Sequence, residues 1–172
     1  MDLVRVGQVV RGIDSLRAGT FVASNFSGKA LAGVIVQSVT GVARPDFLIL
    51  LPGHPDLNEG LPGVISGHLF HDEPFFVFEG ATVVPNVSSL HMGTASENAG
   101  ALVVHENTYL VLGIVTHGMM AFDLSTGDKA SFNDSSPVPK FTKWHVVRRG
   151  RDGQDEVIRT IDWSAVAGAI SV

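Results

Sequence analysis

The sequence predicts an all-β protein, mainly antiparallel, built as a sandwich or barrel-like domain with long loops and a C-terminal hairpin. The 172 residues include 19 Gly and 8 Pro, whereas Lys and Glu, which favour exposed helix surfaces, are scarce. The longest segment without Gly or Pro runs from Gln154 to Ala167, which is barely the length of a helix. Hydrophobic residues make up 45% of the chain, so it can bury a sizeable core.

Four strands are expected in the first 51 residues, at 3–10, 20–23, 29–42 and 47–51. The segment Ile13–Gly19 between the first two is expected to form one helical turn or a loop. Arg44-Pro45-Asp46 ends the third strand, because proline cannot donate to a β-ladder and disfavours helix before it. Phe47–Leu51 (FLILL) is apolar throughout, which indicates a strand buried on both faces.

Two irregular loops flank the next strand. The first, Pro52–Gly67, holds three prolines and four glycines, and a loop of this length is usually functional or packed at an interface. Phe75–Glu79 and Ala81–Val84 are then interpreted as one strand with a kink at Gly80. The second loop, Pro85–Gly100, is small and polar.

Tyr109–Phe122 (YLVLGIVTHGMMAF) is the most apolar stretch and follows a short strand at Ala101–His105. At about 3.3 Å per residue it would make a strand longer than small domains usually hold. We therefore expect a bulge or bend at Gly113 or Gly118. The block around Gly33 (LAGVIV) is weakly similar to the block around Gly113 (LVLGIV). Either an internal repeat or shared composition would produce this similarity.

A hairpin across Ser125–Asp128 is expected to lead into a strand at Lys129–Phe132, after which Asn133–Pro139 (NDSSPVP) is the best candidate linker. The expected organisation is a β-rich main domain at 1–132, a linker-like loop at 133–139, and a hairpin with a C-terminal segment at 140–172. We expect this last part to pack on the main domain or on a neighbouring subunit.

The clearest local signal is a hairpin formed by Lys143–Arg149 and Glu156–Trp163. The turn between them contains Asp152-Gly153, a pair that suits a tight turn with positive φ. Six basic and three acidic residues give the segment 140–159 a charge of +3, so the remainder carries −8. A basic hairpin on an acidic body favours contacts between subunits or with an acidic partner, although a solvated hairpin with cross-strand salt bridges would show the same pattern.

Composition and motifs argue against several function classes. Without cysteine there is no disulfide, thiol nucleophile or zinc–thiolate site, and the net charge of −5 disfavours general binding to nucleic acid. No apolar run approaches the ~20 residues of a membrane helix, and the N-terminus lacks the apolar core of a signal peptide. Standard catalytic signatures are also missing, so we expect a non-enzymatic protein with no cofactor.

The histidines suggest an alternative function, the binding of a metal ion or small molecule. The run His71–Gly80 (HDEPFFVFEG) is similar to the first metal motif of the cupins. This resemblance implies His68, His71 and Glu79 or Glu73 as metal ligands, with a further ligand later in the chain such as His91. The chain has H-x-x-H where cupins have H-x-H, which puts the two histidines on opposite faces of a straight strand. Hydrogen-bonded or solvated loop histidines are the competing interpretation.

Two further segments resemble the small β proteins that decorate tailed-phage capsids. They are LRAGTFVASNFSGKALAGVIVQSVTG and GTASENAGALVV, in which glycines recur within β structure. The resemblance implies a virion decoration or cement protein that stabilises a shell through contacts with itself and with a major capsid protein. The expected location is then the virion, and otherwise the cytoplasm.

Apolar loops, tryptophan and the basic hairpin supply the candidate interface. Leucines in the irregular loop cannot all be buried within it, and exposed aromatic and arginine side chains anchor many interfaces. The expected interface residues are Leu57, Leu61, Phe70, Trp144, Arg148, Arg149 and Arg151.

Overall fold

The computed structural model describes residues 7–26, 28–50, 62–93, 99–115, 118–131 and 137–164, and these form β-strands joined by turns and short 3-10 helices. The all-β class is therefore confirmed. The strands are β1 (Gln8–Arg11), β2 (Phe21–Phe26), β3 (Lys29–Val36), β4 (Asp46–Ile49), β5 (Gly63–Ile65), β6 (Pro74–Val77), β7 (Thr82–Pro85), β8 (Leu90–Gly93), β9 (Leu102–His105), β10 (Thr108–Val115), β11 (Gly118–Asp123), β12 (Lys129–Ala130), β13 (Val138–Phe141), β14 (Lys143–Arg149) and β15 (Asp155–Asp162). The 3-10 helices are η1 (Ile13–Ser15), η3 (Gly67–Phe70) and η4 (Val87–Ser89).

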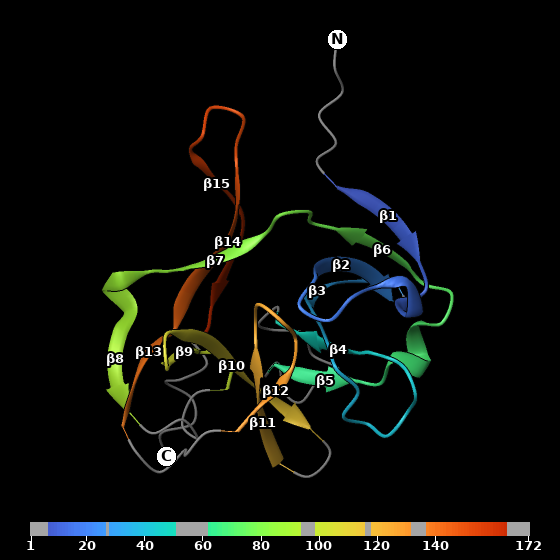
Figure 1. Cartoon of the computed structure of the whole chain (residues 1–172), viewed down its shortest axis with the longest axis horizontal. Coiled ribbons are helices and arrows are strands. Elements are labelled where there is room, and N and C mark those ends of the chain that lie inside the picture. The colour runs from blue at the N-terminus through green and yellow to red at the C-terminus, as the bar shows by residue number, and fades with distance from the viewer. Residues whose placement is uncertain are drawn as a thin grey trace.

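The described strands form a large sheet and a small one, arranged as a sandwich (Figure 1). The twelve-stranded sheet has the order β1-β6-β2-β3-β4-β5-β10-β9-β13-β8, with β11 on β10 and β12 on β11. The three-stranded sheet has the order β15-β14-β7. Pairing is antiparallel except between β5 and β10, where Ile114 faces Gly63 in parallel register. The large sheet ends at β1 and β8 and does not close into a barrel.

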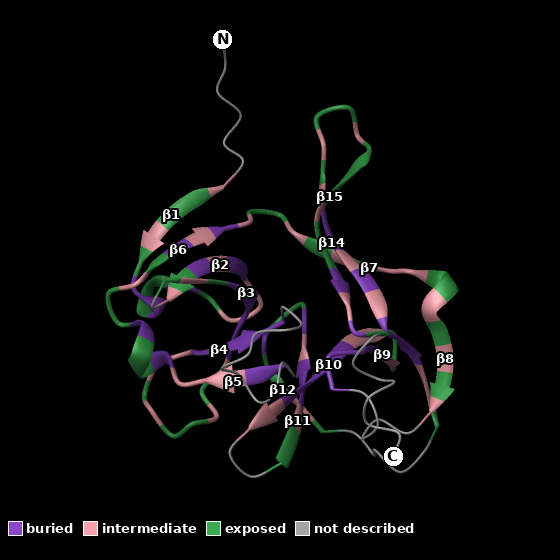
Figure 2. Ribbon diagram, turned by 180° about the vertical axis from the view of Figure 1, so that it is seen from behind, coloured by how far each residue is buried: buried purple, intermediate pink, exposed green. Residues whose placement is uncertain are grey.

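Apolar side chains on opposite faces of β3 and β4 enter two different cores. Val34 and Leu48 belong to the core between the two sheets, together with Trp144 of β14 and Trp163, which directly follows β15. Ile35 and Phe47 belong to a second core on the other face, which η1 and η3 help to cover. Figure 2 shows these strands as largely buried. The uninterrupted apolar runs in the sequence are thus explained, because neither face of these strands meets solvent.

The expectation of a single bent strand at Tyr109–Phe122 is wrong. The stretch forms a hairpin in which β10 and β11 pair antiparallel, from Leu110 opposite Asp123 to Val115 opposite Gly118. Gly113 lies in regular register and marks no bulge, while Gly118 opens the second strand with φ near 122°. Folding the run back on itself buries apolar residues of both halves, which one long strand would not achieve.

The expected kinked strand at Phe75–Val84 is also two strands, and they belong to different sheets. β6 pairs with β1 and β2 in the large sheet, whereas β7 pairs with β14 in the small sheet. The turn at Gly80 therefore carries the chain from one layer of the sandwich to the other. The second loop likewise contains a helix, η4, and a strand, β8, that the sequence did not reveal.

The C-terminal hairpin is confirmed, with β14 and β15 antiparallel from Lys143–Asp162 to Arg149–Asp155. Residues 133–136 of the expected linker lie outside the described residues. From Val138 the chain is strand β13, which pairs with β8 and β9 in the large sheet. The division into a main domain, a linker and a C-terminal part stays a prediction.

Candidate functional site

The β14–β15 hairpin extends beyond the body of the molecule as an arm, defined here as Arg148–Glu156 (Figures 1 and 2). Its tip is held by backbone hydrogen bonds from Gly150 N to Gln154 O (2.7 Å) and from Gly153 N to Gly150 O (3.1 Å). Gly153 has φ near 79°, the positive value that its place in the turn predicted. The arm is thus a short projection with a hydrogen-bonded tip.

One arginine of the arm forms an ion pair across the hairpin, whereas the other two form none with a described residue. Arg148 bonds Glu156 across the hairpin, with Nε and Nη2 at 2.8 and 2.6 Å from Oε2. Arg149 and Arg151 are exposed and form no ion pair with any described residue. Cross-strand salt bridging, the competing interpretation of the charge pattern, therefore accounts for Arg148 in the arm and for Lys143 at the base of the hairpin, whose Nζ lies 3.6 Å from Asp162 Oδ2. Lys140, another member of the basic segment, is fully buried and adds nothing to this surface.

Two aromatic residues expected at an interface lie in the cores instead. Trp144 is fully buried, and its indole nitrogen donates to Gly100 O at 3.1 Å. Phe70 is fully buried against Phe47 and Phe75, with ring centroids 5.3 and 5.7 Å away. Phe70 was expected at an interface because its segment looked irregular, and Trp144 because it lies near an end of the predicted hairpin, but the sandwich covers both. They stabilise the fold and offer no free surface to another chain.

The remaining interface candidates have different outcomes. Leu57 and Leu61 lie outside the described residues, so their role stays a prediction. Arg149 and Arg151 are on the surface as expected, and Arg148 is partly covered. Whether any of them contacts a partner also stays a prediction.

Four exposed apolar residues, called here the apolar ridge and missed in the sequence analysis, lie on β7, η4 and β8, which follow one another along one side of the molecule (Figure 1). Its members are Val84, Val87, Leu90 and Met92, whose exposed fractions are 38%, 74%, 49% and 62%. Among the described strands, β8 ends the large sheet and pairs with β13 alone, so no described strand lies along its other edge. The alternation of Leu90 and Met92 with His91 and Gly93 was the signal for this strand, hidden in a segment interpreted as a polar loop.

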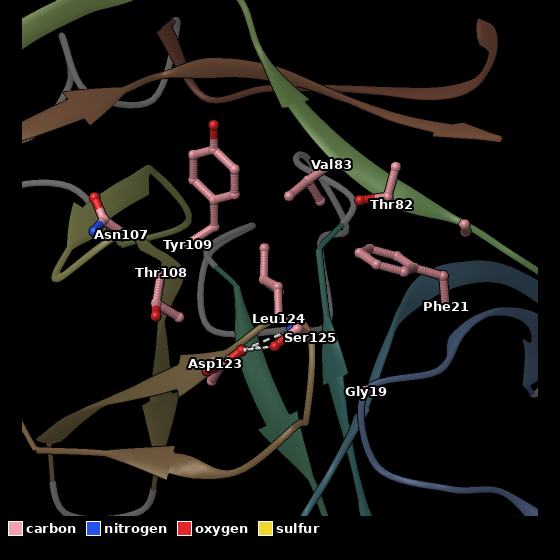
Figure 3. A pocket seen from close by; sticks show the side chains of 11 residues that line it. Gly19, Phe21, Thr82, Val83, Asn107, Thr108, Tyr109, Asp123, Leu124 and Ser125 are labelled. Carbon is pink, nitrogen blue, oxygen red and sulfur yellow. Dashed lines mark hydrogen bonds between the residues drawn. The ribbon is translucent and has the colours of Figure 1, made fainter. Parts of the chain in front are cut away.

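A pocket of about 310 Å³ opens between the two sheets (Figure 3). Its lining comes from the start of β2, the strand β7, the β9–β10 turn and the turn after β11. The lining residues are Gly19, Phe21, Ala81, Thr82, Val83, Asn107, Thr108, Tyr109, Asp123, Leu124 and Ser125. Aromatic and aliphatic groups form its walls, and hydroxyl, amide and carboxylate groups lie among them, which is the usual make-up of a small binding site.

Asp123 is the charged residue of this lining, and no lysine or arginine is among the described residues that line the pocket. Its Oδ1 accepts hydrogen bonds from the backbone nitrogen and the hydroxyl of Ser125, at 2.7 and 2.6 Å (Figure 3). Its Oδ2 has no hydrogen-bond partner among the described residues. The pocket therefore suits a cationic or donor-rich group and disfavours an anion, whose charge would meet a carboxylate.

The residues of the alternative metal site do not converge in the described chain. His71 lies beside Arg44, with Nδ1 3.2 Å from Nη1, and beside Asp14 at 3.9 Å. His68 is exposed in η3 and Glu79 is exposed in the turn after β6, while His91 Nδ1 lies 3.3 Å from Ser89 O. Within the described ranges no three His, Asp or Glu side chains are placed to share a metal ion. The cupin-like alternative stays a prediction without support from these contacts.

Comparison with protein-family models, with curated proteins and with solved structures finds no match for this chain. No helix in the described ranges is both long and apolar enough to span a membrane. The function must therefore be argued from the surfaces of the molecule itself.

Proposed function

We propose that this chain is a non-enzymatic virion decoration protein, which stabilises a capsid by associating with itself and by contacting a major capsid protein. The observation that carries the proposal is the arm, because its two available arginines extend from the body on a hydrogen-bonded turn. Arginine is enriched at interface centres, where its planar group makes several hydrogen bonds at once.

The apolar ridge supports the same class of function. Exposed apolar groups gathered along one side of a protein commonly mark contacts with other proteins. The edge of β8 that no described strand covers adds backbone donors and acceptors that another strand could pair with. A shell-binding protein needs two kinds of contact, one to its own copies and one to the shell, and the arm and the ridge are two separate surfaces.

Sedimentation velocity and co-sedimentation test the proposal together. Purified protein is expected to associate as its concentration rises, and to pellet with empty capsids assembled from a major capsid protein of the same source. Protein that remains monomeric at high concentration and stays in the supernatant with capsids would overturn the proposal. Head and portal genes next to the coding sequence would support it independently.

Metal analysis separates this proposal from the cupin-like alternative. Stoichiometric Fe, Mn, Zn or Ni in the purified protein would favour the alternative. Loss of that metal on replacing His68 and His71 with alanine would then assign the site.

A further inference from the structure

We propose that the arm of one copy docks in the Asp123 pocket of a second copy, with Arg149 or Arg151 reaching the carboxylate of Asp123. This inference rests on the self-association in the proposed function and names the surfaces that would carry it. The partner is a second copy of this chain, and the chemistry is recognition of a guanidinium group by a carboxylate beside aromatic rings.

The pocket has the features that a guanidinium group requires. Oδ2 of Asp123 accepts no hydrogen bond from a described residue, so it can accept a charge-assisted hydrogen bond, which is stronger than a bond between neutral groups. The rings of Phe21 and Tyr109 line the same pocket, and a planar guanidinium stacks favourably on such faces. The volume of about 310 Å³ is ample for one arginine side chain.

The arm has the features that the pocket requires. Arg149 and Arg151 are exposed near its tip and form no ion pair within the described chain. The backbone hydrogen bonds of the tip fix the turn, so little ordering of the main chain is needed on docking. The charge difference between the basic segment and the rest of the chain, +3 against −8, also draws the arm of one copy towards the body of another.

The geometry makes the contact heterologous, since the arm and the pocket are different surfaces. The arm extends away from the body in both views, whereas the pocket opens between the sheets (Figures 1, 2 and 3). Repeating such a contact from copy to copy closes a ring or builds an open chain. A ring would suit copies arranged around a symmetry axis of a shell.

A charge-swap experiment tests the docking. Thr82 is exposed on β7 and lines the pocket, so Thr82→Lys adds a positive charge to the pocket without altering Asp123. We expect Thr82→Lys, and separately the double variant Arg149→Glu/Arg151→Glu, to weaken association about tenfold or more at low salt. Combining all three substitutions is expected to recover part of the association that the arm variant loses, because the lysine at position 82 then attracts the introduced glutamates while Asp123 still repels them. The readout is the dissociation constant from sedimentation velocity.

A matched control changes the same number of charges elsewhere. Arg11 and Arg17 are exposed outside the arm, and Arg11→Glu/Arg17→Glu is expected to leave association within about twofold of wild type. Unchanged circular dichroism and melting temperature establish that each variant is folded.

The possible outcomes separate this inference from the proposed function. Wild-type protein that associates while the arm variant and Thr82→Lys associate equally well overturns the docking but leaves self-association standing. An arm variant that weakens association without rescue by Thr82→Lys overturns the pocket as the docking site. Wild-type protein that neither associates nor binds capsids overturns the proposed function along with the docking.

Discussion

At the scale of single residues, Asp46 shows how a buried charge can hold irregular segments together. Its carboxylate is fully buried and accepts hydrogen bonds from the backbone nitrogens of Val39 (2.7 Å), Thr40 (2.9 Å) and Gly67 (3.0 Å), and from the hydroxyl of Thr40 (2.9 Å). The loop after β3 and the start of η3 are thus fastened to the first residue of β4. A buried carboxylate is tolerable because it is surrounded by donors.

Replacing Asp46 with alanine is expected to lower the free energy of unfolding by about 2–4 kcal/mol, because the buried backbone donors lose their acceptor. Urea denaturation followed by circular dichroism measures the change. Asp72 is the control, since its side chain is 93% exposed and its replacement with alanine should cost less than about 0.5 kcal/mol. Equal effects of the two substitutions would contradict the structural role of Asp46.

The central glycines of the two similar blocks offer a second prediction at this scale. A Cβ at Gly33 would overlap the carbonyl oxygen of Leu48, whereas a Cβ at Gly113 would come closest to a terminal methyl of the same leucine, at 2.5 Å. Backbone atoms can shift less than the end of a flexible side chain to relieve such an overlap. We expect Gly33→Ala to cost about 3 kcal/mol or more and Gly113→Ala about 1–2 kcal/mol in urea denaturation. A larger cost at Gly113 would show that the leucine cannot move aside.

At the scale of elements, the β14–β15 hairpin combines a buried base with an exposed arm. Trp144, Val146 and Ile161 fix its base in the core between the sheets. Lys143 and Asp162 pair there at 3.6 Å, and Asp162 also accepts hydrogen bonds from the nitrogen and hydroxyl of Ser164. The hydrogen bonds from Ser164, followed by the charge of Lys143, lower the pKa of Asp162 below its ordinary value of 3.8.

This lowered pKa predicts a small loss of stability in acid. Because the folded state binds the proton of Asp162 more weakly than the unfolded state does, the contribution is complete above pH 3.8 and is lost as the pH falls through the folded pKa. The residue is 41% exposed, so the effect should be below about 1 kcal/mol. Urea denaturation of wild type and Asp162→Asn from about pH 7 to about pH 2 measures it. The difference between the two proteins should shrink only in the acid part of that range.

At the scale of the whole molecule, one core joins both sheets. The core between them contains Val34 and Leu48 from the large sheet and Trp144 and Ile161 from the small one. Trp144 also donates a hydrogen bond to Gly100, which lies just before β9 of the large sheet. Residues from the expected main domain and from the expected C-terminal part thus share the same buried contacts.

We therefore expect the chain to unfold in a single cooperative transition. Tryptophan fluorescence reports on the shared core, because Trp144 and Trp163 both lie in it, while far-ultraviolet circular dichroism reports on all strands. The two signals should give the same midpoint in urea. Two separate midpoints would show that residues 140–172 form an independent unit, as the expected division of the chain would allow.

Sequence reasoning was most successful where the signal is local. The turn at Asp152-Gly153 and the apolar run Phe47–Leu50 each specify their own conformation, so the hairpin and the doubly buried strand were correctly predicted. Sequence reasoning failed where one sequence pattern is compatible with two different backbone conformations. The run around Gly118 fits one bent strand or a hairpin, and only burial of both halves selects the hairpin. The pocket could not be predicted, since its walls come from segments far apart in the chain.

The all-β class, most strand positions and the basic character of the C-terminal hairpin could be predicted, because alternation, turn residues and charge are properties of neighbouring residues. The tertiary structure alone places β6 and β7 in different sheets and buries Phe70 and Trp144. It likewise decided that Arg149 and Arg151 are available while Arg148 is paired. Strand partners and burial depend on which distant segments meet, and a one-dimensional pattern carries no record of that choice.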